Sequence, residues 1–460
     1  MPSKTHINKR IFFCGFGQSA LKESMLQHLQ EYKYDFVAHL CIKDYLREFR
    51  DTYFTQKEGY RKEQFRGNPD DTLPPADVLE HMRPIELLFL KMLDRTHKSP
   101  TPYRRYEYRK RLFLAQLTFV YSILTKHRIN QIVFSITPHN PFDFILHHLA
   151  SYLGIRSQFL FQTRIIDSFI LTDSLGKLFD PIDDVKEIDI SDHKNFPKHL
   201  EAEIILRTEN KLPFYMSSKG LTFLQRFYKK QKRIIRIHSY TQFFFGRKPK
   251  RIYEKLPKIS APPEDPFIYF PLHYQPEAST SPMGGIYVDQ CLTIMTISRA
   301  LPEGMLMVVK EHPAQRFWQR YPDFYLTLQK EKNIVFAEQT ANSHELTQKS
   351  FAVATITGTA AWESVFLKKP VFLFGTMFCE KIKGVLKVNS QEEIRKAIEQ
   401  IKDGNFPLSS ENDIRQFLAR FNQITLQGVT DEAYFRISRI GREASIKNVT
   451  SVLAKIATSP

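Results

Sequence analysis

The stretch ATITGTAAWESVFLKKPVFLFG, residues 354–375, decides the fold class. Its hydrophobic pattern predicts a buried strand, a turn of small residues, a short helix and a second buried strand. Strands that alternate with helices in this way form a parallel sheet that helices cover on both faces. The sequence therefore predicts an α/β protein.

The turn in this stretch contains Thr357, Gly358 and Thr359. A plain connection does not need two hydroxyl groups around a glycine. Free backbone N–H groups at the start of a helix favour an anion, and a glycine lets the anion approach the backbone closely. We therefore expect a phosphate-binding site here. The alternative is a threonine that caps the helix in a tight turn.

The same alternation of strands and helices extends over both halves of the 460-residue chain. It predicts two Rossmann-like lobes that face each other across a cleft, with helices at the C-terminus. Residues 258–266 are expected to be a linker. The predicted parts are an N-terminal lobe (1–215), a basic aromatic connector (216–260), a C-terminal lobe (261–430) and C-terminal helices (431–460). The expected strands contain RIFFC, DFVAHLCI, QIVF and RSQFLF in the first half, and FIYF, MLMVV, NIVFA, FAVATI and PVFLF in the second.

The formal net charge of +17 is concentrated in residues 226–258, which hold twelve Lys and Arg, one acid and seven aromatic residues. Basic charge together with aromatic rings is typical of a segment that rests on an anionic membrane. A solvated helix with one buried face is the alternative. Nucleic acid is not an expected partner, because no helix-turn-helix, RNP or zinc-finger pattern occurs.

Four cysteines show no paired spacing, which argues against a disulfide framework or a zinc site. The first residues do not have the pattern of a signal peptide, and no run of about 18 apolar residues predicts a transmembrane helix. We therefore expect a cytoplasmic protein.

Ligands of open parallel sheets bind beyond the carboxyl ends of the strands. Lys310, Glu311 and His312 follow one of the apolar strands directly. His312 can donate a hydrogen bond to a phosphate, and Lys310 can add positive charge. The alternative is a histidine that is satisfied near the surface.

Two further features belong to the predicted site. The loop over residues 271–285 holds Tyr274 and Gln275 among other polar groups and is a candidate for lining a cleft; its alternative is an exposed loop. Glu363 lies one turn into the short helix and can reach a ribose hydroxyl. It could equally be a surface acid or the partner of Lys310.

Three motifs carry a resemblance to a known family: YFPLHYQPEASTSP at residues 269–282, VKEHP at 309–313 and TITGTAAWE at 355–363. In this order they resemble the capsule polysaccharide biosynthesis family, which includes bacterial Kdo transferases. They are similar more distantly to bacterial polysialyltransferases. The resemblance implies a GT-B glycosyltransferase, and several members of the family use a CMP-activated sugar.

The resemblance also implies roles for individual residues. His312, Thr357 and Thr359 would hold the phosphate of the donor, and Glu363 would face the nucleotide. A nucleoside monophosphate can leave with the help of histidine and backbone donors, without a metal. No Asp-x-Asp motif follows a predicted strand, so we expect no metal and no cofactor besides the nucleotide-sugar donor, which is a substrate.

The catalytic base of this architecture would come from the N-terminal lobe. Asp167 closely follows the strand SQFLFQTR and is the first candidate for a base or, in a retaining route, a nucleophile. His139, in SITPHNPFD, is the second. The alternative for each is a structural role, such as capping the start of a helix.

The sequence thus predicts a transferase of bacterial capsular or surface polysaccharide synthesis. It would move Kdo or another acidic sugar from a CMP donor to a glycan or lipid-linked acceptor bound by the N-terminal lobe. It would act in the cytoplasm, with peripheral contact to the anionic inner membrane. The alternatives are a UDP-sugar transferase or an enzyme like the nucleotide-sugar 2-epimerases, and a non-catalytic scaffold of a capsule assembly complex.

Overall fold

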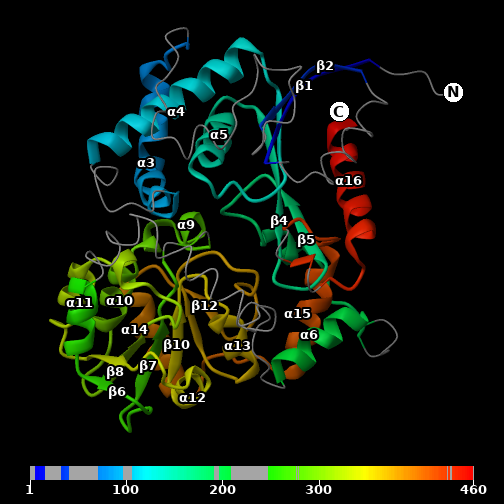
Figure 1. Cartoon of the computed structure of the whole chain (residues 1–460). Helices are drawn as coiled ribbons and strands as arrows, with labels where there is room; N and C mark the ends of the chain where they lie inside the picture. The colour runs from blue at the N-terminus through cyan, green and yellow to red at the C-terminus, as the bar shows by residue number, and fades with distance from the viewer. Residues whose placement is uncertain are drawn as a thin grey trace, which may run out of the picture. The chain divides into compact units, whose positions relative to one another are not determined.

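The computed structural model describes residues 6–15, 33–40, 71–96, 106–190, 196–208, 247–275, 277, 279–431, 434–435 and 438–458. The chain divides into two compact units (Figure 1). The first unit comprises Met1–His97, Pro102–Pro181 and Phe421–Pro460, and the second comprises Lys98–Thr101 and Ile182–Arg420. Each unit is built on one sheet. The predicted α/β class with two Rossmann-like lobes is confirmed.

The first sheet has the strand order β13-β5-β4-β3-β1-β2. The four strands predicted from the sequence, β1 to β4, pair in parallel. The prediction of a wholly parallel sheet is wrong at the other edge, where β5 is antiparallel to both β4 and β13. Only residues 163–167 join β4 to β5, which is too short for a parallel crossover. The strands are β1 (His6–Cys14), β2 (Lys33–Leu40), β3 (Gln131–Phe134), β4 (Arg156–Gln162), β5 (Ser168–Thr172) and β13 (Leu426–Gln427).

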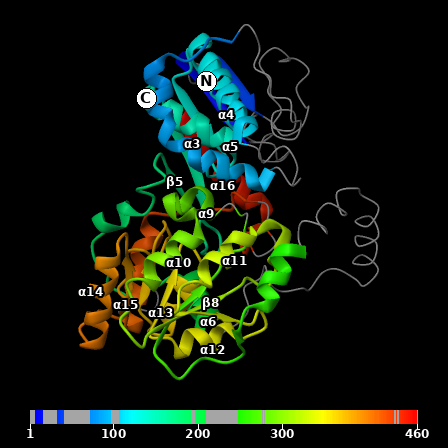
Figure 2. The ribbon, with the colours of Figure 1, turned by 90° about the vertical axis from the view of Figure 1, so that its left-hand side faces the viewer.

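Helices cover both faces of the first sheet. On one face, His147 of α5 packs edge-on against Phe134 and Phe159, and α3 and α4 pack on α5. Figure 2 looks onto α3 and α4. Gly154 has a φ of +69° just beyond the end of α5, a conformation that glycine adopts readily. The helices of this unit are α3 (Ala76–Thr96), α4 (Tyr106–Lys126), α5 (Pro141–Tyr152) and α16 (Arg442–Thr458).

The opposite face of the first sheet is covered by the C-terminal helix α16. Val449 and Leu453 of α16 share a buried cluster with Phe13, Leu160 and other strand residues. The predicted boundaries differ from this division, because the end of the chain completes the first unit. Leu426–Gln427, which the prediction assigned to the C-terminal lobe, is the edge strand β13 of the first sheet, and its partner β5 lies far away in the sequence.

The predicted boundary at residue 215 differs as well. The division falls within the 3-10 helix η3 (Asp180–Asp184) and within α15 (Glu411–Gln423). Helix α6 (Lys198–Thr208) belongs to the second unit, where Glu203 accepts a hydrogen bond from Trp362 Nε1 at 3.1 Å. Such long-range contacts leave no local mark on the sequence.

The second sheet is wholly parallel, with the order β12-β11-β10-β7-β8-β9-β6. All five strands predicted for this half are confirmed. The expected linker at 258–266 contributes a short edge strand, β6, which pairs with β9. The strands are β6 (Lys258–Ile259), β7 (Phe267–Pro271), β8 (Leu306–Lys310), β9 (Ile334–Ala337), β10 (Ala352–Thr355), β11 (Val371–Leu373) and β12 (Val385–Lys387).

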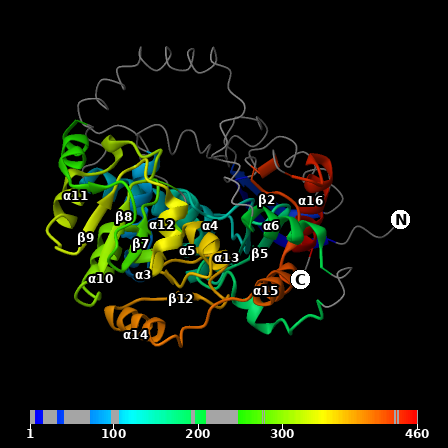
Figure 3. The same cartoon turned by 90° about the horizontal axis from the view of Figure 1, so that it is seen from below.

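Helices cover both faces of this sheet too (Figure 3). One face packs on α10, α11 and α14 through a large apolar cluster, and the other packs on α12 and α13. The longer helices are α10 (Gln290–Ser298), α11 (Pro322–Leu328), α12 (Ser343–Lys349), α13 (Ala360–Phe366) and α14 (Gln391–Lys402); the short ones are α9 (Thr280–Met283), η4 (Gly285–Val288) and η5 (Phe317–Gln319).

The predicted connector, residues 216–260, lies largely outside the described residues. Its last part is helical over residues 247–255 and then forms β6. Among the helices that the structure describes, none has both the length and the apolar character to cross a membrane.

Candidate functional site

The order of the second sheet creates a topological switch point beside β7. The chain runs from β7 to β8 and β9 on one side, then returns to place β10 on the other side of β7. The connections after β7 and after β10 therefore diverge, and in open parallel sheets ligands bind beyond the carboxyl ends of strands at such a point. The three polar loops predicted from the sequence follow β7, β8 and β10, which are neighbours in the sheet.

The loops after β7 and β10 contact each other through His273. The backbone N–H of Thr357 donates to His273 Nε2 at 3.3 Å, and Thr355 Oγ1 lies 3.2 Å from the same nitrogen. His273 is buried, with 7% of its surface exposed. His273 belongs to the predicted polar loop but is not among the predicted site residues. Its position just after a buried strand is the signal that could have indicated a role in the site.

Gly358 fits tightly into this contact. Its N–H donates to Thr355 Oγ1 at 3.1 Å, and a Cβ atom at position 358 would lie only 2.6 Å from that oxygen. The hydroxyl of Thr357 is buried and has no hydrogen-bond partner among the described residues. A buried hydroxyl of this kind is an unused donor at the switch point.

Thr359 and Glu363 lie on the far side of the same turn. Thr359 precedes α13 but does not cap it, since its side chain accepts no capping hydrogen bond. This excludes the simple N-cap that was the alternative for Thr359. The carboxylate of Glu363 lies 3.8 Å from Arg207 Nη1, and the Glu363 side chain is 43% exposed. Glu363 thus has a cationic neighbour on α6.

Glu311 is a structural residue, which corrects its predicted role in donor binding. Its side chain is fully buried and forms two ion-pair hydrogen bonds with Arg320, at 2.7 and 3.1 Å. It also accepts from Tyr325 OH at 2.7 Å and from the backbone N–H of His312 at 2.8 Å. With both oxygens engaged, Glu311 holds the loop after β8 and offers nothing to a ligand.

Gln275 has a similar internal role. Its side-chain amide donates to Val288 O at 2.8 Å, and its backbone exchanges two hydrogen bonds with the side chain of Gln315. The Tyr274 hydroxyl donates to Gln319 at 3.2 Å, while the Tyr274 ring packs edge-on against His312. These hydrogen bonds fix the loop, and the roles of Gln275 and Tyr274 in donor binding stay predictions.

His312 presents one ring N–H to its surroundings. Its Nδ1 accepts a hydrogen bond from the backbone N–H of Ala314 at 3.1 Å, so the proton of the neutral ring is on Nε2. Among the described residues, Nε2 has no hydrogen-bond partner. Burial lowers the pKa of His312, although the carboxylates of Glu277 and Glu311 oppose this effect. His312 is thus a neutral donor.

Lys310 is a buried cation at the same edge. Only 4% of its surface is exposed, and its ammonium donates to Ser343 Oγ at 3.0 Å. It forms no ion pair with any carboxylate that the structure describes. Burial lowers the pKa of Lys310 because it penalises the charged form.

The strand register relates Lys310 to the Thr-Gly-Thr turn. Pro271 of β7 pairs with Lys310, and Tyr269 pairs with both Val308 and Val353. Thr355 lies two residues beyond Val353, so it shares a row and a face of the sheet with Lys310. With one strand between them, their backbones are about 10 Å apart. A phosphate group with its sugar can bridge this distance.

The first unit has a switch point of its own, between the carboxyl ends of β1 and β3. His139 lies in the loop after β3, and its Nδ1 is 2.8 Å from the carbonyl oxygen of Thr137. A carbonyl can only accept, so the ring proton is on Nδ1, and Nε2 is the basic nitrogen. Asp143 lies nearby, where Asn140 Nδ2 and Cys14 Sγ donate to its carboxylate at 2.9 and 3.2 Å.

Asp167 is placed elsewhere, in the turn between β4 and β5. It is buried and has a φ of +56°. Its Oδ2 accepts from the backbone N–H groups of Arg439 and Ile440, and its carbonyl accepts from Gly428. These bonds tie the C-terminal segment to the hairpin. They favour the structural alternative for Asp167, although its buried Oδ1 makes no hydrogen bond with the described residues, and its role as the base stays a prediction.

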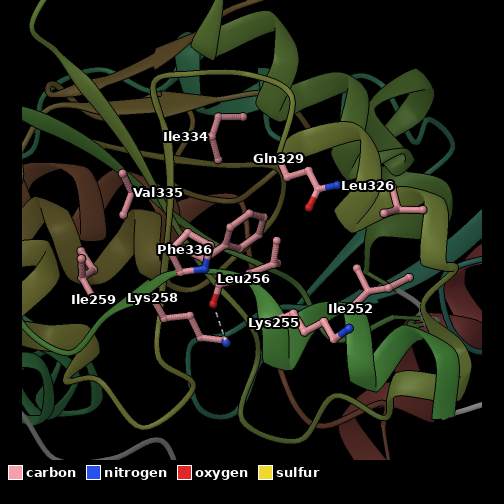
Figure 4. A pocket seen from close by; sticks show the side chains of 11 residues that line it. Ile252, Lys255, Leu256, Lys258, Ile259, Leu326, Gln329, Ile334, Val335 and Phe336 are labelled. Carbon is pink, nitrogen blue, oxygen red and sulfur yellow. Dashed lines mark hydrogen bonds between the residues drawn. The ribbon is translucent and has the colours of Figure 1, made fainter.

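A cavity lies apart from the polar loops at the carboxyl ends of β7, β8 and β10 (Figure 4). It has a volume of about 490 Å³ and shares no residue with the site described above. Its lining is mainly apolar, with Ile252, Leu256, Ile334 and Phe336 among its side chains and Lys255 beside them. Within the described part of the chain, no three His, Cys, Asp or Glu side chains are grouped so that they could hold a metal ion.

Comparison with protein families gives a match within the second unit. Residues 266–407 match the model of a family described as capsule polysaccharide biosynthesis protein. The matched segment is about a third of the chain, and it is similar to this family. It contains the three quoted motifs, so the predicted resemblance is confirmed. No curated protein matches the chain.

The solved structures that are similar to this chain are distant from it in sequence. KpsC of Thermosulfurimonas dismutans, a β-Kdo 2,7 transferase, is 10% identical, with a TM-score of 0.34 and coverage of 97% of this chain and 100% of KpsC. UDP-GlcNAc 2-epimerase of Methanocaldococcus jannaschii is 10% identical, with a TM-score of 0.28 and coverage of 91% and 99%. At these scores the likeness does not bear on the activity of this chain.

Proposed function

We propose that this protein is a glycosyltransferase of capsular or surface polysaccharide synthesis, and that its second unit binds the phosphate of a nucleotide-sugar donor. The capsule family of residues 266–407 supports this class of reaction. The observation that carries the proposal is a set of polar groups at the carboxyl ends of β7, β8 and β10 whose capacity the described residues leave partly unused: two donors without an acceptor, and an ammonium that donates to Ser343 Oγ but has no carboxylate partner. They are the buried hydroxyl of Thr357, the Nε2–H of His312 and the buried ammonium of Lys310.

The energetic argument rests on Lys310. A buried ammonium without a carboxylate loses much of its hydration and gains no ion pair in return, so it destabilises the empty site. A bound phosphate would supply the missing negative charge. Charge-assisted hydrogen bonds of this kind are stronger than those between neutral groups.

The same donors suit the chemical step. When the bond between the sugar and the nucleotide breaks, negative charge grows on the departing phosphate. Donors that are already fixed in place stabilise this charge without reorganising. His312 fits this role because its backbone bond to Ala314 fixes the ring and directs its proton to Nε2.

For the acceptor, we propose His139 of the first unit as the group that takes the proton from the attacking hydroxyl. Its basic nitrogen is Nε2, and it follows β3 at the switch point of the first sheet. The donor we propose is CMP-Kdo or another CMP-activated acidic sugar, and the acceptor a glycan or a lipid-linked sugar. Peripheral contact with an anionic inner membrane through residues 226–258 is part of the same proposal.

The test is calorimetric titration with CMP, UDP and GDP. We expect CMP to bind the wild type and to bind His312→Ala at least tenfold more weakly, because one charge-assisted hydrogen bond is lost. The control is Lys396→Met, on the exposed side of α14 in the same unit, which should leave binding unchanged. A preference for UDP would favour a UDP-sugar transferase or an epimerase. Turnover of a UDP-sugar in the absence of an acceptor distinguishes the two, because only the epimerase needs no acceptor. Absence of nucleotide binding would overturn the proposal and favour the scaffold.

A further inference from the structure

Glu277 lies beside the proposed donor site, in the loop after β7, and its carboxylate acts on the pKa of His312. Its Oε1 is 3.0 Å from His273 Nδ1, and its side chain is 24% exposed. On the other side of the same ring, Nε2 contacts the Thr-Gly-Thr turn. Glu277, His273 and Thr357 therefore form a chain of contacts that joins the loop after β7 to the loop after β10.

The contacts of His273 fix its tautomer. The backbone N–H of Thr357 can only donate, so Nε2 must carry a lone pair. The proton of the neutral ring is therefore on Nδ1, which faces the carboxylate of Glu277. A carboxylate at this place favours that tautomer over the alternative, in which an Nε2–H would oppose the N–H of Thr357.

The turn held in this way carries the unpaired hydroxyl of Thr357. Its backbone is anchored by His273 Nε2, and Gly358 N–H is anchored by Thr355 Oγ1. The hydroxyl of Thr357 itself forms no hydrogen bond with any residue that the structure describes. The direction of this hydroxyl is therefore set by the backbone that His273 holds.

We propose that Glu277 is a positioning residue of the donor site. It holds His273 in the Nδ1–H tautomer, and His273 in turn holds the Thr357 backbone so that the Thr357 hydroxyl is directed at the donor phosphate. The inference rests on the proposed function for its ligand, but the tautomer of His273 is a property of the protein alone. It assigns Glu277 a function through orientation and not through contact with the donor.

Two variants separate positioning from charge. Glu277→Gln removes the negative charge but keeps an oxygen beside Nδ1–H, whereas Glu277→Ala removes both. The tautomer is read from the ¹⁵N chemical shifts of His273 in the full-length protein, assigned with a His273→Asn variant. Binding is measured by titration with CMP.

We expect wild type and Glu277→Gln to show a protonated Nδ1, and Glu277→Ala to show a mixture of tautomers. CMP should bind Glu277→Gln as tightly as wild type or more tightly, because a negative charge near the phosphate is gone. It should bind Glu277→Ala about tenfold more weakly.

Two results would overturn the positioning role: an unchanged tautomer and CMP affinity in Glu277→Ala, or a loss in Glu277→Gln as large as in Glu277→Ala. If the wild type itself does not bind CMP, the proposed donor site fails. The tautomer of His273 in Glu277→Ala then still decides whether Glu277 orients the ring. If Glu277→Ala does not fold, Glu277→Gln is the test: the positioning role requires that His273 in this variant keeps the Nδ1–H tautomer.

Discussion

Arg320 and Glu311 form a bidentate ion pair inside the second unit, with Nη2–Oε1 and Nε–Oε2 distances of 2.7 and 3.1 Å. Burial would lower the pKa of Arg320, but the attraction of Glu311 outweighs it and raises the pKa. Burial and the nearby Glu311 also raise the pKa of Tyr325, which donates to the same carboxylate. The pair fixes the loop that presents His312.

We expect Arg320→Ala to destabilise the second unit by about 3–5 kcal/mol, because it leaves the carboxylate of Glu311 buried without its cation. Urea unfolding at neutral pH measures the free energy of unfolding. Arg299→Ala is the matched control, since its ion pair with Glu331 is half-exposed and should be worth less than about 1 kcal/mol. Equal losses in the two variants would contradict the structural role of the buried pair.

Lys310→Met should have opposite effects on stability and on binding. Removal of a buried ammonium without an ion pair should leave the free energy of unfolding unchanged or raise it by about 1 kcal/mol. CMP affinity should fall at least tenfold, since the charge that attracts the phosphate is lost. Thermal unfolding and calorimetry on the same preparation measure both. A variant that is less stable and binds CMP normally would show that Lys310 serves the fold alone.

Asp167 should respond to substitution as a structural residue. Asp167→Asn keeps an oxygen for the N–H groups of Arg439 and Ile440, and asparagine tolerates the positive φ. We expect it to fold and turn over donor within a few-fold of wild type. Asp167→Ala should lose about 1–3 kcal/mol, because these buried N–H groups lose their acceptor. Loss of turnover in a stably folded Asp167→Asn protein would return Asp167 to the catalytic machinery.

Two neighbouring histidines should make the first unit sensitive to acid. Burial lowers the pKa of His147 to about 3 and that of His148 to about 4. An unfolded histidine has a pKa of about 6.5, so between these values the unfolded chain binds more protons than the folded one. Stability is therefore present above about pH 6.5 and falls as the pH drops towards 4, by at most about 1.4 kcal/mol per pH unit for each histidine.

The check is urea unfolding of the wild type and of His147→Phe between about pH 7.5 and about pH 5. Phenylalanine fits beside Phe134 and Phe159 and does not titrate. It loses the contact of His147 Nδ1 with Ser157 Oγ, which should lower stability at every pH by a similar amount. The variant should have the smaller pH slope; an identical slope would show that His147 does not contribute to it.

The apolar strands were predictable because each buried run of the two parallel sheets is bounded by turn residues. The short edge strands β6, β12 and β13 were not, since two or three residues become a strand only through a partner that lies elsewhere in the chain. The hairpin β4–β5 was not predicted, because all strands of the first sheet were expected to be parallel. Whether a short segment forms a strand depends on its tertiary pairing, about which the local sequence carries no information.

The candidate site shows the same limit at the level of side chains. The strand-end rule correctly brought the loops of His312 and Thr357 to one edge. It could not show that Glu311 is structural while His312 is a candidate for binding. The partner of Glu311 is Arg320, nine residues further on, and nothing in the local sequence indicates this pairing. It also left out His273, whose importance comes from a contact with a turn more than eighty residues away.

The return of α16 to the first sheet affects how the protein is made. Synthesis runs from the N-terminus, so the strands that carry Phe13 and Leu160 leave the ribosome long before Val449 and Leu453, which cover them. During that interval the second unit can complete its own sheet, whereas one apolar face of the first remains exposed. The unit that is begun first is therefore finished last, and a nascent chain at this stage is a client for a holding chaperone.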